Sequence, residues 1–395
     1  MSSRGRLLHA WTRQVEAVLP AARVTRVRVL ALFAAGIVWA NAVTLGQVAA
    51  ALPLGATDPS TERRLQRFLC NPGVDVATLW EPLLPILLAT LGRGPLVLVF
   101  DPTPYRDDAT ILVLGVVVRR RVLPLAWRVM PQQEPWPERL RDGLGPLLAP
   151  VAAAIPAGTP VTLLADRGLV GPGIIDAARA VGWHIVLRLR AGAGETTRVR
   201  LGAGPVQRLA ELPTGPGQRF AGPAAIFQDA GWRDGFLTIH WDRAAQEPWG
   251  LFSDRAPGPD RVREYRQRVR AEATYQDEKT RGFGLEASKI TALARIERLL
   301  LPLHLALWWA YGLGLQAIRN GQRHRFDRRD RRDRSVLRIG RRACLDALDR
   351  DHLPALPFRH TPLGWAFRWL RCNCQGERGD RVSGCLGVCA IGNGL

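Results

Sequence analysis

The run Leu96-Val97-Leu98-Val99-Phe100-Asp101 decides the fold of this 395-residue chain. Five consecutive apolar residues predict a buried central strand, and a carboxylate follows at once. A second apolar run, Val161 to Ala165, is also followed directly by a carboxylate, Asp166. Burying two carboxylates at strand ends is costly unless they are paired or bind cations. The two runs therefore predict two buried strands that each bring a carboxylate to a polar site.

The segments around these runs predict the rest of an α/β sheet. Residues 111–118 and 122–129 form a strand hairpin around three arginines, residues 137–153 and 173–181 are expected to be helical, and residues 184–189 are expected to form a strand. This order of strand, hairpin, helix, strand, helix and strand is that of a ribonuclease H-like sheet. Residues 191–247, rich in Gly and Pro with short alternating stretches, interrupt this order and predict a β-rich insertion.

The predicted fold class is thus an α/β, ribonuclease H-like catalytic domain with a β-rich insertion, preceded by an all-α, helix-turn-helix-like domain. Five segments follow: a helical DNA-binding domain (1–92), the first part of the catalytic domain (93–190), the insertion (191–247), the second catalytic part (248–320), and a basic C-terminal segment with an unassigned tail (321–395).

The first ninety or so residues are expected to form short helices. Two of them are joined by a turn: residues 48–52, which follow the capping box Thr44-Leu-Gly-Gln47, and residues 60–69. Asp58-Pro59 predicts the start of the second helix and Asn71 its end. This helix carries Arg63, Arg64 and Arg67, as a recognition helix entering a DNA groove would. An ordinary solvated helical face explains the same arginines equally well.

The charge balance favours a polyanionic partner. The net charge is +20, which attracts nucleic acid or, as a second choice, an anionic membrane surface. The apolar stretches 29–54 and 299–318 are interrupted by polar residues, Gly and Pro, so buried helices explain them better than membrane spans. The first ten residues do not predict a signal peptide. The clustered Cys372, Cys374, Cys385 and Cys389 match no common zinc-binding spacing.

A polar helix is predicted over residues 261–281, and its geometry gathers one stripe of side chains. At 100° per residue, Tyr265, Arg268, Glu272, Gln276 and Lys279 fall within an arc of roughly 80°. A third carboxylate, Glu272, could therefore join Asp101 and Asp166 in a divalent-metal site. A solvated helix face could show the same stripe.

The spacing Tyr265-x2-Arg268-x3-Glu272-x6-Lys279 resembles the Y-R-E-K signature of cut-and-paste DDE transposases of the insertion-sequence-four family. The segments Leu-Val-Phe-Asp101-Pro-Thr and Leu-Leu-Ala-Asp166-Arg-Gly are similar to the family's two aspartate motifs. The resemblance covers roughly residues 24–342, and the long interval before Glu272 holds the β insertion that this family places there.

The resemblance implies a function and its residues. Asp101, Asp166 and Glu272 would hold two Mg²⁺ or Mn²⁺ ions that catalyse DNA cleavage and strand transfer at terminal inverted repeats. It also implies DNA contacts by Tyr265, Arg268 and Lys279, and places Trp249 where family members stack a tryptophan on a displaced base. The partners would be the double-stranded terminal repeats, target DNA and a second copy in a homodimer, in the cytoplasm at the bacterial nucleoid and without a membrane.

Three other interpretations stay open. A structure-specific nuclease on the same scaffold would share the carboxylates without needing the insertion or the stripe. An inactive, transposase-derived DNA-binding protein would retain the motif without a competent site. A membrane protein is the third.

Overall fold

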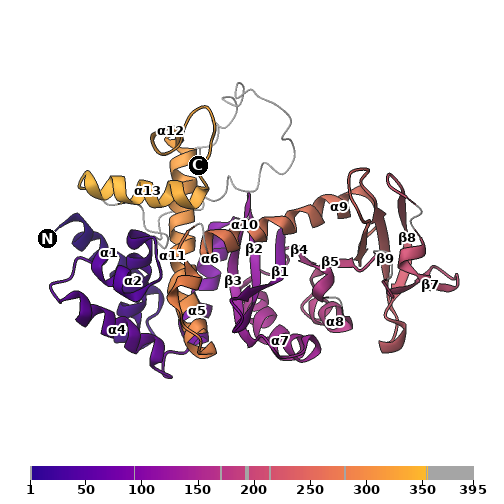
Figure 1. Ribbon diagram of the computed structural model, residues 1–395, viewed down its shortest axis with the longest axis horizontal. Helices are drawn as coiled ribbons and strands as arrows, with labels where there is room; N and C mark the ends of the chain where they lie inside the picture. The colour runs from indigo at the N-terminus through magenta and orange to yellow at the C-terminus, as the bar shows by residue number, and fades with distance from the viewer. Residues whose placement is uncertain are drawn as a thin grey trace, which may run out of the picture.

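Ten strands of this computed structural model form one mixed sheet, flanked on one side by the N-terminal helices (Figure 1). The strand order is β3-β2-β1-β4-β5-β10-β9-β8-β6-β7. The structure describes residues 2–92, 94–169, 171–191, 195–212, 215–279, 282–352 and 354.

The first five strands have the order and directions expected of a ribonuclease H-like sheet. They are β1 (Leu96–Tyr105), β2 (Ala109–Val118), β3 (Arg121–Pro131), β4 (Val161–Ala165) and β5 (His184–Leu189). β2 is antiparallel to both of its neighbours, while β4 is parallel to β1 and to β5. The central strands are apolar almost throughout because both faces of the sheet are covered there, in part by α7 (Trp136–Ala154) and α8 (Pro172–Ala180).

The predicted insertion is rich in strands, and it lengthens the same sheet. Its strands are β6 (Arg198–Leu201), β7 (Val206–Arg208), β8 (Arg219–Ile226) and β9 (Arg233–His240). They join the first five through β10 (Trp249–Ser253), which pairs antiparallel with β5 on one side and β9 on the other. In Figure 1 these strands form the end of the sheet farthest from the N-terminal helices.

The N-terminal region is helical, as the sequence predicts. Its helices are α1 (Ser3–Val18), α2 (Val24–Ala40), α3 (Leu45–Ala51), α4 (Asp58–Cys70), α5 (Val76–Trp80), the 3₁₀ turn η1 (Glu81–Leu83) and α6 (Leu84–Thr90). α4 begins where Pro59 fits the first turn and ends at Asn71, with Thr57 rather than Asp58 at the N-cap. α3 packs against α4.

The long helix α11 (Leu293–Arg319) joins the N-terminal helices to the sheet. It packs against α2 and β3, and the Trp309 ring stacks on Trp11 of α1 at a centroid distance of 4.7 Å. The Tyr311 hydroxyl donates a hydrogen bond to the Val118 carbonyl in β2. One continuous hydrophobic core therefore includes both the N-terminal helices and the sheet.

One described helix, α11, is long and apolar enough to cross a membrane, but 89% of its most apolar stretch is buried inside the protein. α2 and α3 pass the same test only when taken together, and they are bent by 90°. These observations agree with the predicted buried helices.

Three sequence expectations need correction or fall outside the description. β1 continues past Asp101 to Tyr105, because β2 remains its hydrogen-bonded neighbour over those residues. The predicted continuous helix over residues 261–281 is interrupted: α9 (Pro259–Tyr265) and α10 (Arg270–Glu278) are joined by a 3₁₀ turn, η5 (Arg266–Val269). The clustered cysteines, Cys372, Cys374, Cys385 and Cys389, lie outside the described residues.

Candidate active site

The pairing of β1 with β4 places the two aspartates side by side. The last paired residues of these parallel strands are Phe100 and Ala165, and Asp101 and Asp166 come directly after them. The Asp101 side chain is 5% exposed and that of Asp166 is 23% exposed. The two carboxylates thus meet at the carboxyl edge of the parallel pair, as their positions after two apolar runs predict.

The helical segment that carries Glu272 is fixed to the sheet by contacts on its other face. The hydroxyl of Thr274 accepts a hydrogen bond from the Val122 N–H, and Asp277 accepts one from the Arg121 Nε at 2.7 Å. The Tyr275 hydroxyl donates to the backbone carbonyl of Asp101 at 3.2 Å. α10 therefore lies across the start of β3 and the middle of β1, beside the aspartates.

Arg268 connects the three carboxylates. Its Nη2 atom lies 3.1 Å from Asp101 Oδ1 and 3.0 Å from Asp166 Oδ2, and its Nη1 atom lies 3.4 Å from Glu272 Oε1. The Arg268 side chain is 15% exposed, whereas that of Glu272 is 59% exposed. The structure thus brings Asp101, Asp166 and Glu272 around one guanidinium, with Glu272 on the solvent side.

Tyr265 belongs to the same cluster. Its hydroxyl donates to Asp166 Oδ1 at 2.9 Å, and its ring packs edge-on against Trp249 at a centroid distance of 5.2 Å. The stripe forms despite the break in the helix. A 3₁₀ turn advances about 120° per residue instead of 100°, so the helical wheel places these side chains only approximately.

Lys279 lies at the C-cap of α10, on the other side of Glu272. Its ammonium group donates to the Pro104 carbonyl in β1 and lies 3.6 Å from Glu286 Oε1. Burial lowers the pKa of Lys279, although Glu286 opposes this effect. Lys279 is therefore near the edge of β1 that carries Asp101, but it does not contact the three carboxylates.

Burial and charge affect the two aspartates differently. Burial raises the pKa of Asp101 to about 6, although the Arg268 guanidinium opposes it. Burial would also raise the pKa of Asp166, but Arg268, the Arg167 N–H and the Tyr265 hydroxyl outweigh it and lower that pKa below its ordinary value. At neutral pH both groups are thus mainly ionised.

The residues of this cluster fit a divalent cation. Carboxylate oxygens are the ligands that Mg²⁺ and Mn²⁺ prefer, and the three carboxylates already share a positive partner. No three His, Cys, Asp or Glu side chains in the described part of the chain stand close enough together to form a ready-made metal site. A cation would therefore compete with Arg268 for these oxygens.

Sequence analysis missed Arg188, on β5. The Arg188 Nη1 atom lies 3.9 Å from Asp166 Oδ1, its Nη2 atom hydrogen-bonds to Glu247, and its guanidinium lies over the Trp249 ring. β4 and β5 are parallel, and Ala165 pairs with Leu187. Asp166 and Arg188 are the residues that follow this pair, so they come to lie side by side. The signal that could have identified Arg188 is a charged residue within the otherwise mostly apolar strand His184–Leu189.

The N-terminal arginines lie far from this cluster in the sequence and on another helix. Arg63, Arg64 and Arg67 are exposed on α4. Arg63 and Arg67 line a surface hollow of about 590 Å³ together with Thr57, Pro59, Ser60, Gln66 and Cys70. These positions leave the arginines accessible to a partner.

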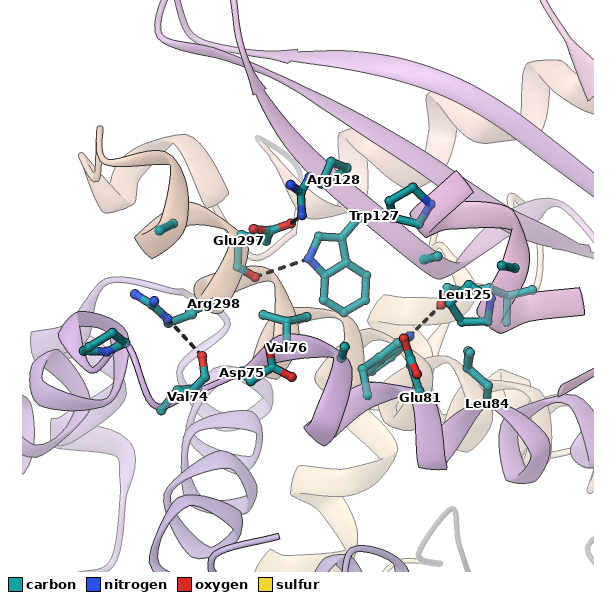
Figure 2. Close-up of a pocket in the computed structure, with 18 residues that line it drawn as sticks. Val74, Asp75, Val76, Glu81, Leu84, Leu125, Trp127, Arg128, Glu297 and Arg298 are labelled. Atoms are coloured by element: carbon teal, nitrogen blue, oxygen red, sulfur yellow. Dashed lines mark hydrogen bonds and ion pairs between the residues drawn. The ribbon is translucent and has the colours of Figure 1, made fainter. Parts of the chain in front are cut away.

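A second cavity, of about 370 Å³, lies where α5, β3, α7 and α11 meet (Figure 2). The Trp127 indole donates to the Glu297 carbonyl, and Arg298 donates to the Val74 carbonyl. The Glu297 carboxylate faces Arg128 at 3.8 Å. These polar groups are engaged with one another at the joint between the N-terminal helices and the sheet, and none of the carboxylates of the candidate active site lines this cavity.

One protein family model matches part of the chain. Residues 141–309 match the family model described as "Transposase DDE domain". The matched region contains Asp166 and Glu272, while Asp101 is supplied from outside it by β1. Residues 141–309 are therefore similar to a DDE transposase domain, a class of domain that acts on DNA in transposition.

Other comparisons add less. A chain from a cryo-EM structure of the piggyBac transposase synaptic complex with hairpin DNA is similar over 92% of this chain and 82% of that chain, with 11% sequence identity and a TM-score of 0.39. No conclusion rests on so low a TM-score. No curated protein matches the sequence.

Proposed function

We propose that the protein cuts and joins DNA at the terminal inverted repeats of an insertion sequence, as a cut-and-paste transposase of the insertion-sequence-four type. The observation that carries the proposal is the convergence of Asp101, Asp166 and Glu272 on one guanidinium, in a chain whose residues 141–309 match a DDE transposase domain. The Y-R-E-K spacing supports the narrower assignment.

The three carboxylates would hold two Mg²⁺ or Mn²⁺ ions. Such ions activate a water or 3′-hydroxyl and stabilise the leaving oxygen of a phosphodiester. Tyr265 orients the Asp166 carboxylate through its hydroxyl, and Tyr275 holds the backbone of Asp101 in place. These contacts restrain the two aspartates, while the carboxylate oxygens themselves would have to move from Arg268 to the ions.

In this proposal, Arg268 and Lys279 also contact phosphates of the DNA. If bound cations neutralised the carboxylates, the Arg268 guanidinium would be free to contact a phosphate of the strand being cut, beside the Lys279 ammonium group. Such contacts would position the DNA without reading its sequence.

Trp249 is half-buried between Tyr265 and Arg188, and we propose that it stacks on a base displaced near the cut. The active form is proposed to be a homodimer that holds two DNA ends.

The test uses purified full-length protein, Mg²⁺ and duplexes ending in the inverted repeats that flank its gene. We expect cleavage at the repeat boundary and joining of the freed 3′ end to a target plasmid, both abolished by EDTA. Asp101→Asn, Asp166→Asn and Glu272→Gln should each remove cleavage while the protein still binds the ends.

Asp260→Asn is the matched control, because Asp260 is an exposed carboxylate on α9 that pairs only with Arg263. It should cleave like the unmodified protein. Full cleavage by any of the three active-site variants would remove that residue from the site. Cleavage without joining would favour the structure-specific nuclease, and end binding without either reaction would favour the inactive DNA-binding protein.

A further inference from the structure

A strongly basic segment follows α11 and is not used by the active site. Residues 319–342 contain eleven arginines and three aspartates, a net charge of +8 within a chain whose net charge is +20. The segment comprises the short helix α12 (Arg323–Phe326), residues 328–334, which we call the arginine loop, and the start of α13 (Val336–Asp349).

Asp327 holds the two ends of the arginine loop together. Its side chain is fully buried, and its Oδ2 accepts hydrogen bonds from Arg323 Nε at 3.0 Å and Nη2 at 2.7 Å. Its Oδ1 accepts from the backbone N–H groups of Arg328 at 3.0 Å and Arg334 at 3.1 Å. One carboxylate thus fixes both the first and the last residue of the loop.

The elements on both sides of the loop are anchored as well. Phe326 is buried in a small hydrophobic cluster with Ala317 of α11 and Ile339 of α13. α13 crosses α11 where two glycines meet the opposite backbone. A Cβ on Gly340 would lie 1.7 Å from the Ala310 carbonyl oxygen, and one on Gly314 would lie 2.0 Å from the Val336 oxygen. The loop therefore extends from a rigid base.

The outer arginines of the loop are exposed and uncompensated. Arg329, Arg331 and Arg332 make no hydrogen bond or ion pair with any other described residue, and all three are exposed. Arg328 pairs with Asp330 at the surface. Arg332 has a φ of 53°, a conformation that a non-glycine residue keeps only when its surroundings impose it. The clamp at Asp327 therefore presents three guanidiniums outward at a cost in like-charge repulsion.

We propose that the arginine loop is a preformed binding surface for the phosphate backbone of duplex DNA, separate from the carboxylate site and from α4. The inference rests on the proposed function only in taking DNA as the polyanion. Guanidiniums form bidentate hydrogen bonds with phosphates, and the loop contains only Arg and Asp, with no apolar side chain to enter a lipid layer. In Figure 1 the loop rises on the side of the molecule along which α9 and α10 run.

The first test measures binding of a fluorescent duplex of arbitrary sequence to the full-length protein, without divalent metal, from about 50 to about 200 mM salt. In Arg329→Ala/Arg331→Ala/Arg332→Ala, the slope of log affinity against log salt should flatten by about 0.9 for each lost phosphate contact, or nearly 3 units in total. The charge-matched control replaces three exposed arginines of the insertion, Arg198, Arg208 and Arg219. An equal loss in both triple variants, or none in the loop variant, would overturn the proposal.

The second test separates shape from net charge. Asp327→Asn and Asp330→Asn each remove one negative charge, so both should bind DNA more tightly if charge alone matters. If the Asp327 clamp organises the loop, Asp327→Asn should instead bind roughly ten-fold more weakly than Asp330→Asn, because ordering even one residue's backbone on binding costs that much. Equal affinities would show that no preformed loop exists. Thermal unfolding of both variants checks that they are folded.

The last arm uses phosphatidylserine vesicles in place of DNA. The triple loop variant should lose DNA affinity whether or not it loses vesicle binding. Loss of vesicle binding with unchanged DNA binding would assign the loop to a membrane and overturn the proposal. None of these assays requires cleavage. They therefore test DNA binding by the arginine loop even if the protein does not carry out the proposed reaction.

Discussion

The Nη2 atom of Arg268 lies 3.1 Å from Oδ1 of Asp101, a carboxylate that is almost completely buried. The same nitrogen also contacts Asp166. Burial raises the pKa of Asp101 to about 6, so Arg268 is the counter-ion that makes its ionised form tolerable at neutral pH. The relation between these residues should therefore be measurable as stability.

Arg268→Ala should lower the free energy of unfolding at pH 8 by about 3–5 kcal/mol, the usual cost of leaving a buried charge without its partner. Asp101 has a raised pKa in the folded state, so the folded protein holds a proton that the unfolded chain releases above pH 3.8. Without Arg268 the pKa of Asp101 rises further, so the loss due to Asp101 should shrink as the pH falls toward about 6, below which Asp101 is neutral in both proteins. Urea denaturation at pH 8 and pH 5 measures both effects.

Arg270→Ala is the matched control, because Arg270 is an arginine of the same helical segment and its Nη1 donates to Gln267 Oε1. It should change stability far less than Arg268→Ala at pH 8. Equal losses would mean that Arg268 stabilises the helix generally and is not the counter-ion of Asp101.

The same variant tests the cation site without an activity assay. Since a cation would compete with Arg268 for Asp101 and Asp166, Mn²⁺ should raise the melting temperature of Arg268→Ala more than that of the unmodified protein. Differential scanning calorimetry with and without Mn²⁺ gives the comparison. Asp166→Asn in the Arg268→Ala background should abolish the extra stabilisation, and its persistence would place the bound ion elsewhere.

The exposed arginines of α4 should contribute to recognising the terminal repeats. Arg63→Ala/Arg64→Ala/Arg67→Ala should reduce the ratio between affinity for the protein's own ends and affinity for random duplex DNA, because side chains that reach base edges carry sequence discrimination. Competition binding at fixed salt gives this ratio. A uniform loss on both DNAs would show contacts to phosphates alone.

Deleting the N-terminal helices is not a usable version of that experiment. α2 packs against α11, and the hydrophobic core is continuous from Trp11 to the sheet. The control is therefore a substitution, Arg13→Ala/Arg23→Ala, which removes exposed arginines near α1 and α2. It should leave the ratio unchanged.

A buried acid on α10, the helix that carries Glu272, predicts how stability varies with pH. Glu278 and His304 are both almost completely buried, with Oε1 and Nε2 3.4 Å apart but without a hydrogen bond. Burial raises the pKa of Glu278 to about 8 and lowers that of His304 to about 3. The two groups are thus a neutral acid facing a neutral imidazole near pH 7, although their distance is that of an ion pair.

Between pH 6.5 and about 8, only Glu278 of this pair binds a proton in the folded state that the unfolded chain lacks. Stability should therefore fall as the pH rises through this window, by at most about 1.4 kcal/mol per pH unit. Glu278→Gln should flatten the decline, whereas Glu286→Gln, at a partly exposed carboxylate, should not. Urea denaturation across the window measures the slopes, and a decline that survives Glu278→Gln would mean that Glu278 is ionised in the folded protein.

The sequence predicts those strands well that are marked by their own short run of apolar residues. Val161–Ala165 and His184–Leu189 form strands with the predicted bounds, since short apolar runs between turn residues have few other ways to be buried. The extension of β1 to Tyr105 could not be predicted, because it depends on pairing with β2 rather than on its own residues, two of which are Pro102 and Pro104.

The proximity of the three carboxylates was predictable from the sequence, but their ion-pair partners were not. Asp101 and Asp166 follow from strand ends, and Glu272 follows from helical spacing. The ion pairs of Arg268 depend on how η5 turns the chain between α9 and α10, and no helical periodicity predicts that break. The Arg188 contact depends on the register between β4 and β5, which is a tertiary property.

Tyr265→Phe tests whether the phenol hydroxyl positions Asp166. The hydroxyl donates to Asp166 Oδ1 at 2.9 Å, and this bond is one cause of the lowered pKa of Asp166. Without it, the folded protein should lose about 1.5–3 kcal/mol of stability at neutral pH, as expected for a hydrogen bond to a charged group. A carboxylate whose pKa is lowered in the folded state stabilises the fold at pH values above its unfolded pKa. This stabilisation is lost as the pH falls through the folded pKa, so the stability difference between the unmodified protein and Tyr265→Phe should vanish in acid.

Tyr275→Phe is the matched control for Tyr265→Phe, since its hydroxyl donates to the uncharged backbone carbonyl of Asp101 at 3.2 Å. Tyr275→Phe should lose about 0.5–1.5 kcal/mol of stability, and this loss should not change comparably below pH 4. Unfolding measured from pH 3 to pH 8 separates the two variants, and the acid limb of cleavage should move to higher pH only in Tyr265→Phe. If both variants gave the same stability difference at every pH, the Tyr265 hydroxyl would contribute only to packing against Trp249, and its role in holding Asp166 would be wrong.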